Sequence, residues 1–239
     1  EAAAREYNAA ANELLEAANI AGIDANQLPG LLRRAADMLI AAANALISAA
    51  NIGGIDVNQR LVLLQRAADM RMDAADILHG AAINTRIAPG QGLGFFNIAT
   101  RIRLDAAGEY KLIVDMYSNI GMHKEAADVH RAWALAYKMA IEPEKVAGVR
   151  RSAAVIYTRV EMHKEAAEEH HAAAAASEVA ADMDTHAGRH EAAAREYNAA
   201  ADAHSLAANA YTRAGMVKQA QDMRAQAEGM KKFIKNNVS

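Results

Sequence analysis

The residues best suited to chemistry are histidines, which gather in the C-terminal half of the sequence. Eight of the nine histidines lie between residues 123 and 204. His186 and His190 are four residues apart, and Glu168 with His171 forms the Glu-x-x-His spacing by which helical bundles hold carboxylate-bridged metal ions. Such a centre needs two of these motifs, and the sequence offers one. We therefore expect no metal or other cofactor, and keep these four side chains as the alternative ligands.

The sequence offers even less evidence for other groups of catalytic or ligand-binding residues. The chain has no cysteine, which excludes a disulfide framework, a thiolate zinc site and a cysteine nucleophile. The glycine-rich stretch APGQGLG at 88–94 has no following lysine and no preceding strand, so it predicts a helix-breaking loop rather than a phosphate-binding one. Serine and aspartate are not arranged as a nucleophile elbow. We predict no catalytic residue and a protein that is not an enzyme.

Charge and hydropathy exclude two classes of partner. The net charge is −3, and no basic face suggests nucleic acid. The longest apolar run, at 39–52, is short for a helix that crosses a bilayer. We therefore expect a soluble protein with neither nucleic acid nor membrane as a partner. The compartment stays open between cytosol and secretion, and the cytoplasm is favoured.

The elements that carry these residues are predicted to be helices. Alanine, the strongest helix former, makes up about a quarter of the sequence, whereas there are only three prolines and 5% aromatic residues. Small side chains also let helices approach closely. The composition therefore indicates an all-α fold with tight helix packing and no roomy cofactor pocket.

The first half repeats with a shift of 32 residues. The segment 22–47 matches 54–79 and, more faintly, 86–111, and in each copy apolar residues recur at spacings of three and four. Glycines in the intervening stretches 18–24 and 50–56 predict tight turns. We expect antiparallel helices over 26–51 and 58–82. Their facing rows should include Ala35, Met38 and Ala42, and Ala67, Met70 and Ala74.

The second half has its own recurring phrase. It reads YSNIGMHKEAADVHRAW at 117–133, YTRVEMHKEAAEEHHAA at 157–173, DTHAGRHEAAAREYNAA at 184–200 and YTRAGMVKQAQDMRAQA at 211–227. The alternation of large and small residues around a turn resembles the helix junction of tetratricopeptide-like (TPR-like) repeats over about residues 104–232. These turns recur at 40, 27 and 27 residues, unlike the usual period of about 34. The last three helices should therefore be long and antiparallel.

The two halves together predict a fold. We expect antiparallel helix-turn-helix repeats stacked as an α–α superhelix, a TPR-like solenoid, with repeats of 32 residues over 1–112 and TPR-like repeats over 113–239 in one continuous array. The segment EAAAREYNAAA occurs at 1–11 and again at 191–201. This identity indicates either a parent array with a period of 190 residues or a helix duplicated by engineering.

A solenoid exposes one face of each repeat in register, which is the reason that such folds usually bind proteins or peptides. We therefore predict a scaffold for protein–protein interaction, of adaptor or effector type. Tyr110, Tyr117, Trp133 and Tyr137 are the predicted partner-binding residues, because aromatic residues are enriched at binding hot spots. For each one alone, a role as core anchor is the alternative. The competing function classes are a metal-binding helical bundle and a membrane-active helical toxin.

The first helix carries a further prediction. Its twin at 191–209 has a neighbour on each side, whereas no helix precedes the first one in this sequence. An end helix of a solenoid exposes apolar residues unless a cap covers them. We therefore expect self-association through Tyr7, Leu14 and Leu15.

Overall fold

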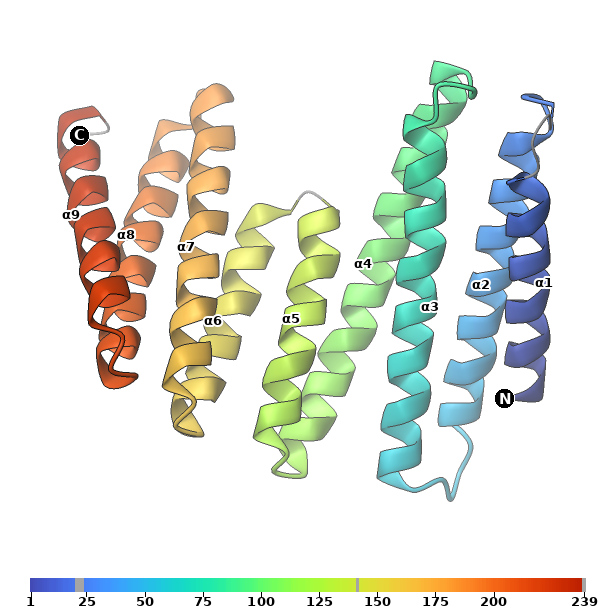
Figure 1. Cartoon of the computed structure of the whole chain (residues 1–239), viewed down its shortest axis with the longest axis horizontal. Coiled ribbons are helices and arrows are strands. Elements are labelled where there is room, and N and C mark those ends of the chain that lie inside the picture. Colours follow the sequence, from blue (N-terminus) through green and yellow to red (C-terminus); the bar gives the residue numbers. More distant parts are fainter. Residues whose placement is uncertain (20–23, 141, 238–239) are drawn as a thin grey trace. The chain divides into compact units, whose positions relative to one another are not determined.

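A computed structural model describes residues 1–19, 24–140 and 142–237, and over these ranges the chain is built from nine α-helices without a strand (Figure 1). The helices are α1 (Ala2–Ala18), α2 (Leu28–Ala50), α3 (Val57–Ile83), α4 (Pro89–Asn119), α5 (His123–Met139), α6 (Pro143–Arg159), α7 (His163–His186), α8 (His190–Arg213) and α9 (Val217–Asn237). The predicted all-α class is confirmed. Over the same ranges, no helix is both long and apolar enough to cross a membrane.

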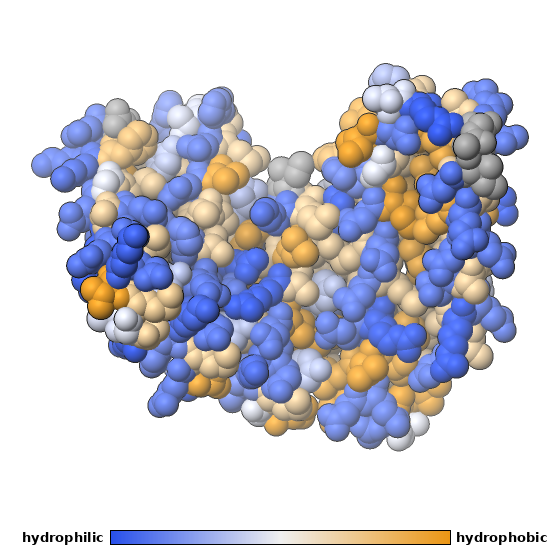
Figure 2. Space-filling view, viewed as in Figure 1, coloured by the Kyte–Doolittle hydropathy of each residue, from blue (hydrophilic) through white to orange (hydrophobic). Residues whose placement is uncertain are grey.

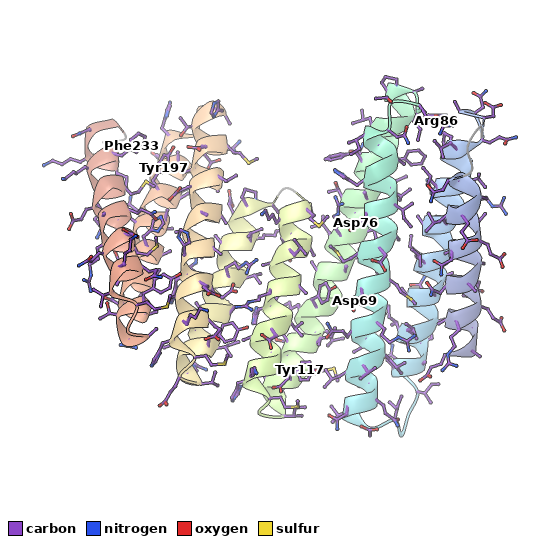
Figure 3. All side chains as sticks on the ribbon, in the orientation of Figure 1. Asp69, Asp76, Arg86, Tyr117, Tyr197 and Phe233 are labelled. Carbon is purple, nitrogen blue, oxygen red and sulfur yellow. The ribbon has the colours of Figure 1, made fainter. Side chains whose placement is uncertain are left out.

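The chain forms two compact units, Glu1–Ile113 and Val114–Ser239, and the boundary falls inside α4. In the first unit α1 packs against α2 and α2 against α3, and buried apolar residues of α3 and α4 belong to one core cluster. Polar contacts also join α3 to α4. Arg103 donates to Asp76 Oδ1 at 2.9 Å, and the Tyr110 hydroxyl donates to Asp69 Oδ1 at 2.7 Å. Figure 3 shows both aspartates on α3.

The predicted rows of small residues in α2 and α3 are buried. Ala35, Ala42, Ala67 and Ala74 are completely buried, and the two methionines of these rows are partly buried. Methyl side chains allow close approach of the two helix backbones, which gives many short contacts for little side-chain entropy. The two predicted helices are confirmed. The predicted turn at 18–24 lies partly outside the described residues, which omit 20–23.

The prediction of a helix-breaking loop at 88–94 is wrong, because α4 already begins at Pro89. Proline suits the first turn of a helix, where no backbone N–H is required. A Cβ atom on Gly92 would lie 2.7 Å from the carbonyl oxygen of Ala82. The glycine therefore permits the start of α4 to pack directly on the end of α3.

The second unit contains α5 to α9, with α5, α7 and α9 in one layer and α6 and α8 in the other (Figure 1). Its four turns that carry the recurring phrase share one backbone geometry. Gly121, Gly188 and Gly215 have φ angles of 80°, 72° and 74°, and Glu161 has the same left-handed form at 60°. This is the conformation that closes a helix and lets the next one start. The predicted long helices α7, α8 and α9 are confirmed.

Candidate functional site

A groove in the second unit runs between α5 and α7 over α6. We call it the α5–α7 groove; its apolar wall includes Val146, Ala176, Val179 and Met183, and Lys138 and Arg150 lie at its edges. The cavity has a volume of about 420 Å³. That size lies within the range of small-ligand and side-chain pockets.

Two apolar side chains of α7 are exposed on the wall of this groove. Val179 and Met183 are one helical turn apart, so they share a face, and they are 52% and 43% exposed. Apolar side chains are visible on the nearer face of the second unit between α5 and α7 (Figure 2). Alanines elsewhere on the same helix are fully buried against its neighbours, as Ala173 and Ala174 are. The two larger side chains are therefore not needed for that packing and remain free to contact a ligand.

Two of the predicted partner-binding aromatics support the groove from α5. The rings of Trp133 and Tyr137 lie 6.2 Å apart and pack with Val146 and Ala176, which line the groove. The indole also stacks on the ring of His130, at 5.2 Å between centroids. Both aromatics are partly buried, so they shape the groove from its side.

The other two predicted aromatics lie elsewhere. Tyr110 is in the first unit, only 3% exposed, and is anchored by its hydrogen bond to Asp69, as expected for a core residue. Tyr117 is partly buried at the turn before α5, where its carbonyl accepts the Met122 N–H at 3.0 Å. The structure therefore brings together only the pair from α5.

A buried carboxylate fixes the helices on which the groove is built. Glu169 of α7 is 2% exposed and accepts hydrogen bonds from Arg131 Nε at 2.6 Å and Arg150 Nη1 at 2.7 Å. The Arg131 guanidinium also lies 5.2 Å from the centre of the Tyr157 ring, whose hydroxyl donates to Asp128. Charge-assisted bonds of this kind are strong and directional. They hold α5, α6 and α7 together and set the position of Arg150 at the groove edge.

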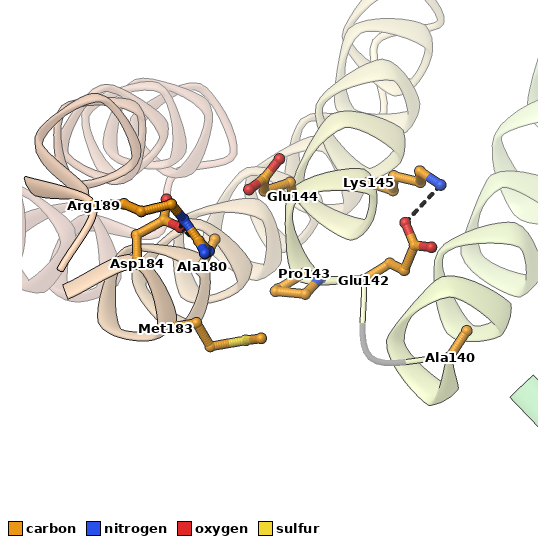
Figure 4. Close-up of a pocket in the computed structure, with 9 residues that line it drawn as sticks. All are labelled: Ala140, Glu142, Pro143, Glu144, Lys145, Ala180, Met183, Asp184 and Arg189. Atoms are coloured by element: carbon orange, nitrogen blue, oxygen red, sulfur yellow. Dashed lines mark hydrogen bonds and ion pairs between the residues drawn. The ribbon is translucent and has the colours of Figure 1, made fainter. Parts of the chain in front are cut away.

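A second pocket adjoins the groove where α7 ends. We call it the Asp184 pocket; it has a volume of about 330 Å³, and Figure 4 shows the residues that line it. Asp184 and Arg189 form its α7 side, and Glu144 and Lys145 of α6 form the opposite side. Lys145 is turned toward Glu142, with 2.6 Å between Nζ and Oε2.

The Asp184 pocket was not predicted, although the sequence contains a signal for it. In the four recurring phrases the first letter is Y, Y, D and Y, so the aspartate is the exception at that position. Whether this aspartate belongs to a site depends on its burial, which a comparison of the four phrases does not show.

The residues kept as alternative metal ligands do not form a centre in the described part of the chain. His186 is exposed, with Nδ1 2.7 Å from the Asp182 carbonyl oxygen, and Glu168 lies 3.8 Å from both Arg131 and Lys164. Across 1–19, 24–140 and 142–237, no three histidine or carboxylate side chains are grouped as metal ligands would be.

Several of the other histidines are packing residues. His130 and His170 are 4% and 7% exposed. Burial lowers the pKa of His130 to about 4, and the nearby carboxylates of Glu169 and Asp115 only partly oppose this shift. Burial also lowers the pKa of His171, as does the imidazole of His204, whose ring centre lies 5.6 Å away. His130 is therefore neutral near pH 7 and serves as a stacking partner for Trp133.

The predicted self-association residues lie on α1. Tyr7 is 40% exposed, and Leu14 and Leu15 are partly buried. The tyrosine thus presents an apolar ring to solvent, whereas the leucines contribute to the packing of the first unit.

Comparisons with known proteins bear on the fold. No protein-family model and no curated protein matches the chain. A solved structure from work on the computational design of self-assembling cyclic homooligomers has a TM-score of 0.51 at 14% identity, over 99% of this chain and 96% of that one. That likeness supports a helical-repeat architecture and, at this identity, nothing beyond the fold.

Two further solved structures are similar at lower scores. One is a kinesin-light-chain-like protein of Podosopora anserina with nearly identical TPR-like repeats, at a TM-score of 0.35 and 14% identity over 100% of this chain and 99% of that one. The other is a de novo designed helical repeat protein, at 0.34 and 17% identity over 98% and 95%. The solved structures that resemble the chain thus include TPR-like and designed helical repeats.

Proposed function

We propose that the chain is a non-enzymatic helical-repeat scaffold that binds an apolar peptide segment of a partner protein in the α5–α7 groove. The observation that carries this proposal is the exposure of Val179 and Met183 on the wall of a cavity of about 420 Å³. A groove between parallel neighbouring helices of a repeat suits an extended or helical segment, whose alternate side chains enter it.

The polar groups around the groove support binding rather than catalysis. The carboxylate of Glu169 is occupied by two arginines, and the imidazole of His130 is buried against Trp133. A general base needs a free lone pair within reach of a substrate. Because these groups are engaged within the protein, they act as supports of the groove wall.

Peptide selection from a random displayed library would test the proposal. Peptides enriched on the wild-type protein should bind the Val179→Asp variant about tenfold more weakly or worse, because a carboxylate on the groove wall opposes apolar contact. Leu206→Asp is the matched control, since Leu206 is 46% exposed on α8, in the other layer.

Both substituted positions are exposed, so far-ultraviolet circular dichroism should show folded proteins in each case. Selected peptides that bind wild type and Val179→Asp equally would contradict the proposed groove. Selective loss in the Leu206→Asp variant would instead move the binding surface to the opposite layer.

A further inference from the structure

The turn between α7 and α8 differs from the other three turns of the second unit at two positions. Tyr117, Tyr157 and Tyr211 precede those turns, and a methionine follows five residues after each tyrosine. At the α7–α8 turn these positions hold Asp184 and Arg189. The backbone still closes in the same way, because the Arg189 N–H donates to the Asp184 carbonyl at 2.8 Å. A charged pair therefore replaces an apolar one without any change in the turn.

The aspartate of this pair is buried, but only one of its two carboxylate oxygens has a hydrogen-bond partner in the described part of the chain. Asp184 is 2% exposed, and its Oδ1 accepts from Arg189 Nε at 2.7 Å. Its other oxygen, Oδ2, is buried without a hydrogen-bond partner among the described residues. A buried acceptor without a hydrogen-bond partner is costly and uncommon in folded proteins, which points to a donor supplied by a ligand. The aspartate is one of the residues that line the Asp184 pocket, and a turn of its side chain would bring Oδ2 to a donor held there.

The charged side chains around the pocket indicate the charge of the group that would supply this donor. Its lining holds three carboxylates and two cationic side chains. Lys145 is paired with Glu142, and Arg189 is paired through one oxygen of Asp184. Glu144 forms no ion pair within the described part of the chain and lines the pocket on its α6 side (Figure 4). The carboxylate of Glu144 and Oδ2 of Asp184 thus have no cationic partner among the lining residues. This arrangement favours a bound cation that carries N–H donors.

We infer that the Asp184 pocket binds the ammonium or guanidinium group of a lysine or arginine side chain, carried by the same peptide that fills the α5–α7 groove. This inference rests on the proposed function. Pro143 and Met183 line both cavities, so the apolar groove and the acidic pocket adjoin each other. A peptide with apolar residues next to one basic residue matches both surfaces at once.

Binding of defined peptides measures this specificity. The probes are fluorescein-labelled Leu-Val-Ala-Lys-Ala-Val-Leu amide and its counterparts with arginine, glutamine or acetyl-lysine at the central position, followed by anisotropy at low ionic strength. We expect the lysine and arginine peptides to bind about fivefold tighter than the two neutral ones. The preference should shrink with added salt, because part of the pocket is open to solvent.

Two variants connect the preference to the pocket. Glu144→Gln, at an exposed position, should reduce the lysine-to-glutamine ratio to about twofold or less. The double substitution Asp184→Tyr with Arg189→Met restores the residues of the other three turns, so it should fold and should abolish the ratio. Glu228→Gln is the control: it makes the same change in net charge at an exposed position of α9 and should keep the full preference.

The outcomes separate this inference from the proposed function. If all four peptides bind the wild type equally well, the groove stands and the cation site is refuted. If the preference persists in both pocket variants, the basic residue is recognised elsewhere. If none of the peptides binds, the groove proposal fails, and the cation site fails with it.

Discussion

The segment EAAAREYNAAA occurs in both α1 and α8, and its two copies have different surroundings. In α8, Tyr197 is 7% exposed; its hydroxyl donates to Asp182 of α7 at 2.6 Å, and its ring meets that of Phe233 of α9 edge-on at 5.1 Å (Figure 3). In α1 the equivalent Tyr7 is 40% exposed. An identical sequence thus gives the same helix twice, whereas the role of its tyrosine depends on the neighbouring helices.

The largest expected effect is one that the two copies share. Ala11 and Ala201 occupy the same place in the segment and are 0% and 1% exposed. Ala11→Glu and Ala201→Glu should each lower the free energy of unfolding by about 3–5 kcal/mol, because each buries an unpaired charge in a close-packed seam. Urea denaturation of the two variants checks this. A loss in one copy alone would show that the two helices do not bury the same face.

A smaller effect should distinguish the copies. Tyr197→Ala removes a ring packed between two helices and should lower the free energy of unfolding by about 3 kcal/mol, whereas Tyr7→Ala should lower it by under about 1 kcal/mol. Thermal and urea unfolding would measure both. Equal losses from the two substitutions would mean that Tyr7 is covered in solution, and the contrast drawn from the structure would be wrong.

The hydroxyl group gives a finer version of the same comparison. Tyr197→Phe keeps the ring but leaves Asp182 without its donor, so it should cost about 1 kcal/mol of unfolding free energy, and Tyr7→Phe should cost almost nothing. Phe233→Leu in the Tyr197→Phe background is a useful control. It changes the partner ring on α9 and not the hydroxyl group at residue 197, so its effect should add to that of the lost hydrogen bond.

The smallest expected effect concerns association between molecules. If the exposed Tyr7 takes part in self-association, Tyr7→Lys should raise the dissociation constant of that association about threefold to fivefold, because one apolar ring contributes modestly to an interface. Sedimentation equilibrium at several concentrations measures this, with helix content as the control. A wild-type protein that stays monomeric at millimolar concentration would rule out this role for the tyrosine.

Much of the fold follows from local sequence patterns. The rows of small residues in α2 and α3 repeat with helical spacing, so both the helices and their buried faces could be predicted. The phrases around Gly121, Gly188 and Gly215 identify turns because glycine adopts the left-handed form easily. Glu161 takes the same form without glycine, which shows that the flanking helices impose the turn there.

What could not be predicted depends on contacts between distant residues. The glycines at 88–94 suggested a loop, but Gly92 is needed for close approach to Ala82, a contact that only the packed helices define. The burial of Asp184 could not be predicted either, because it depends on how α6 meets the end of α7. The two arginines that hold Glu169 come from different helices, so no local spacing indicates the cluster.

That cluster has a mechanical consequence. Seams lined by alanine present shallow ridges, so apolar contact alone leaves two such helices relatively free to slide along each other. Glu169 on α7 is bound from α5 and from α6, and both ion pairs retain their geometry at only one axial offset of the three helices. A shift by one helical turn would move the carboxylate about 5 Å from its arginines. The two ion pairs of Glu169 therefore fix the register of α5, α6 and α7 where contacts between alanines alone would allow sliding.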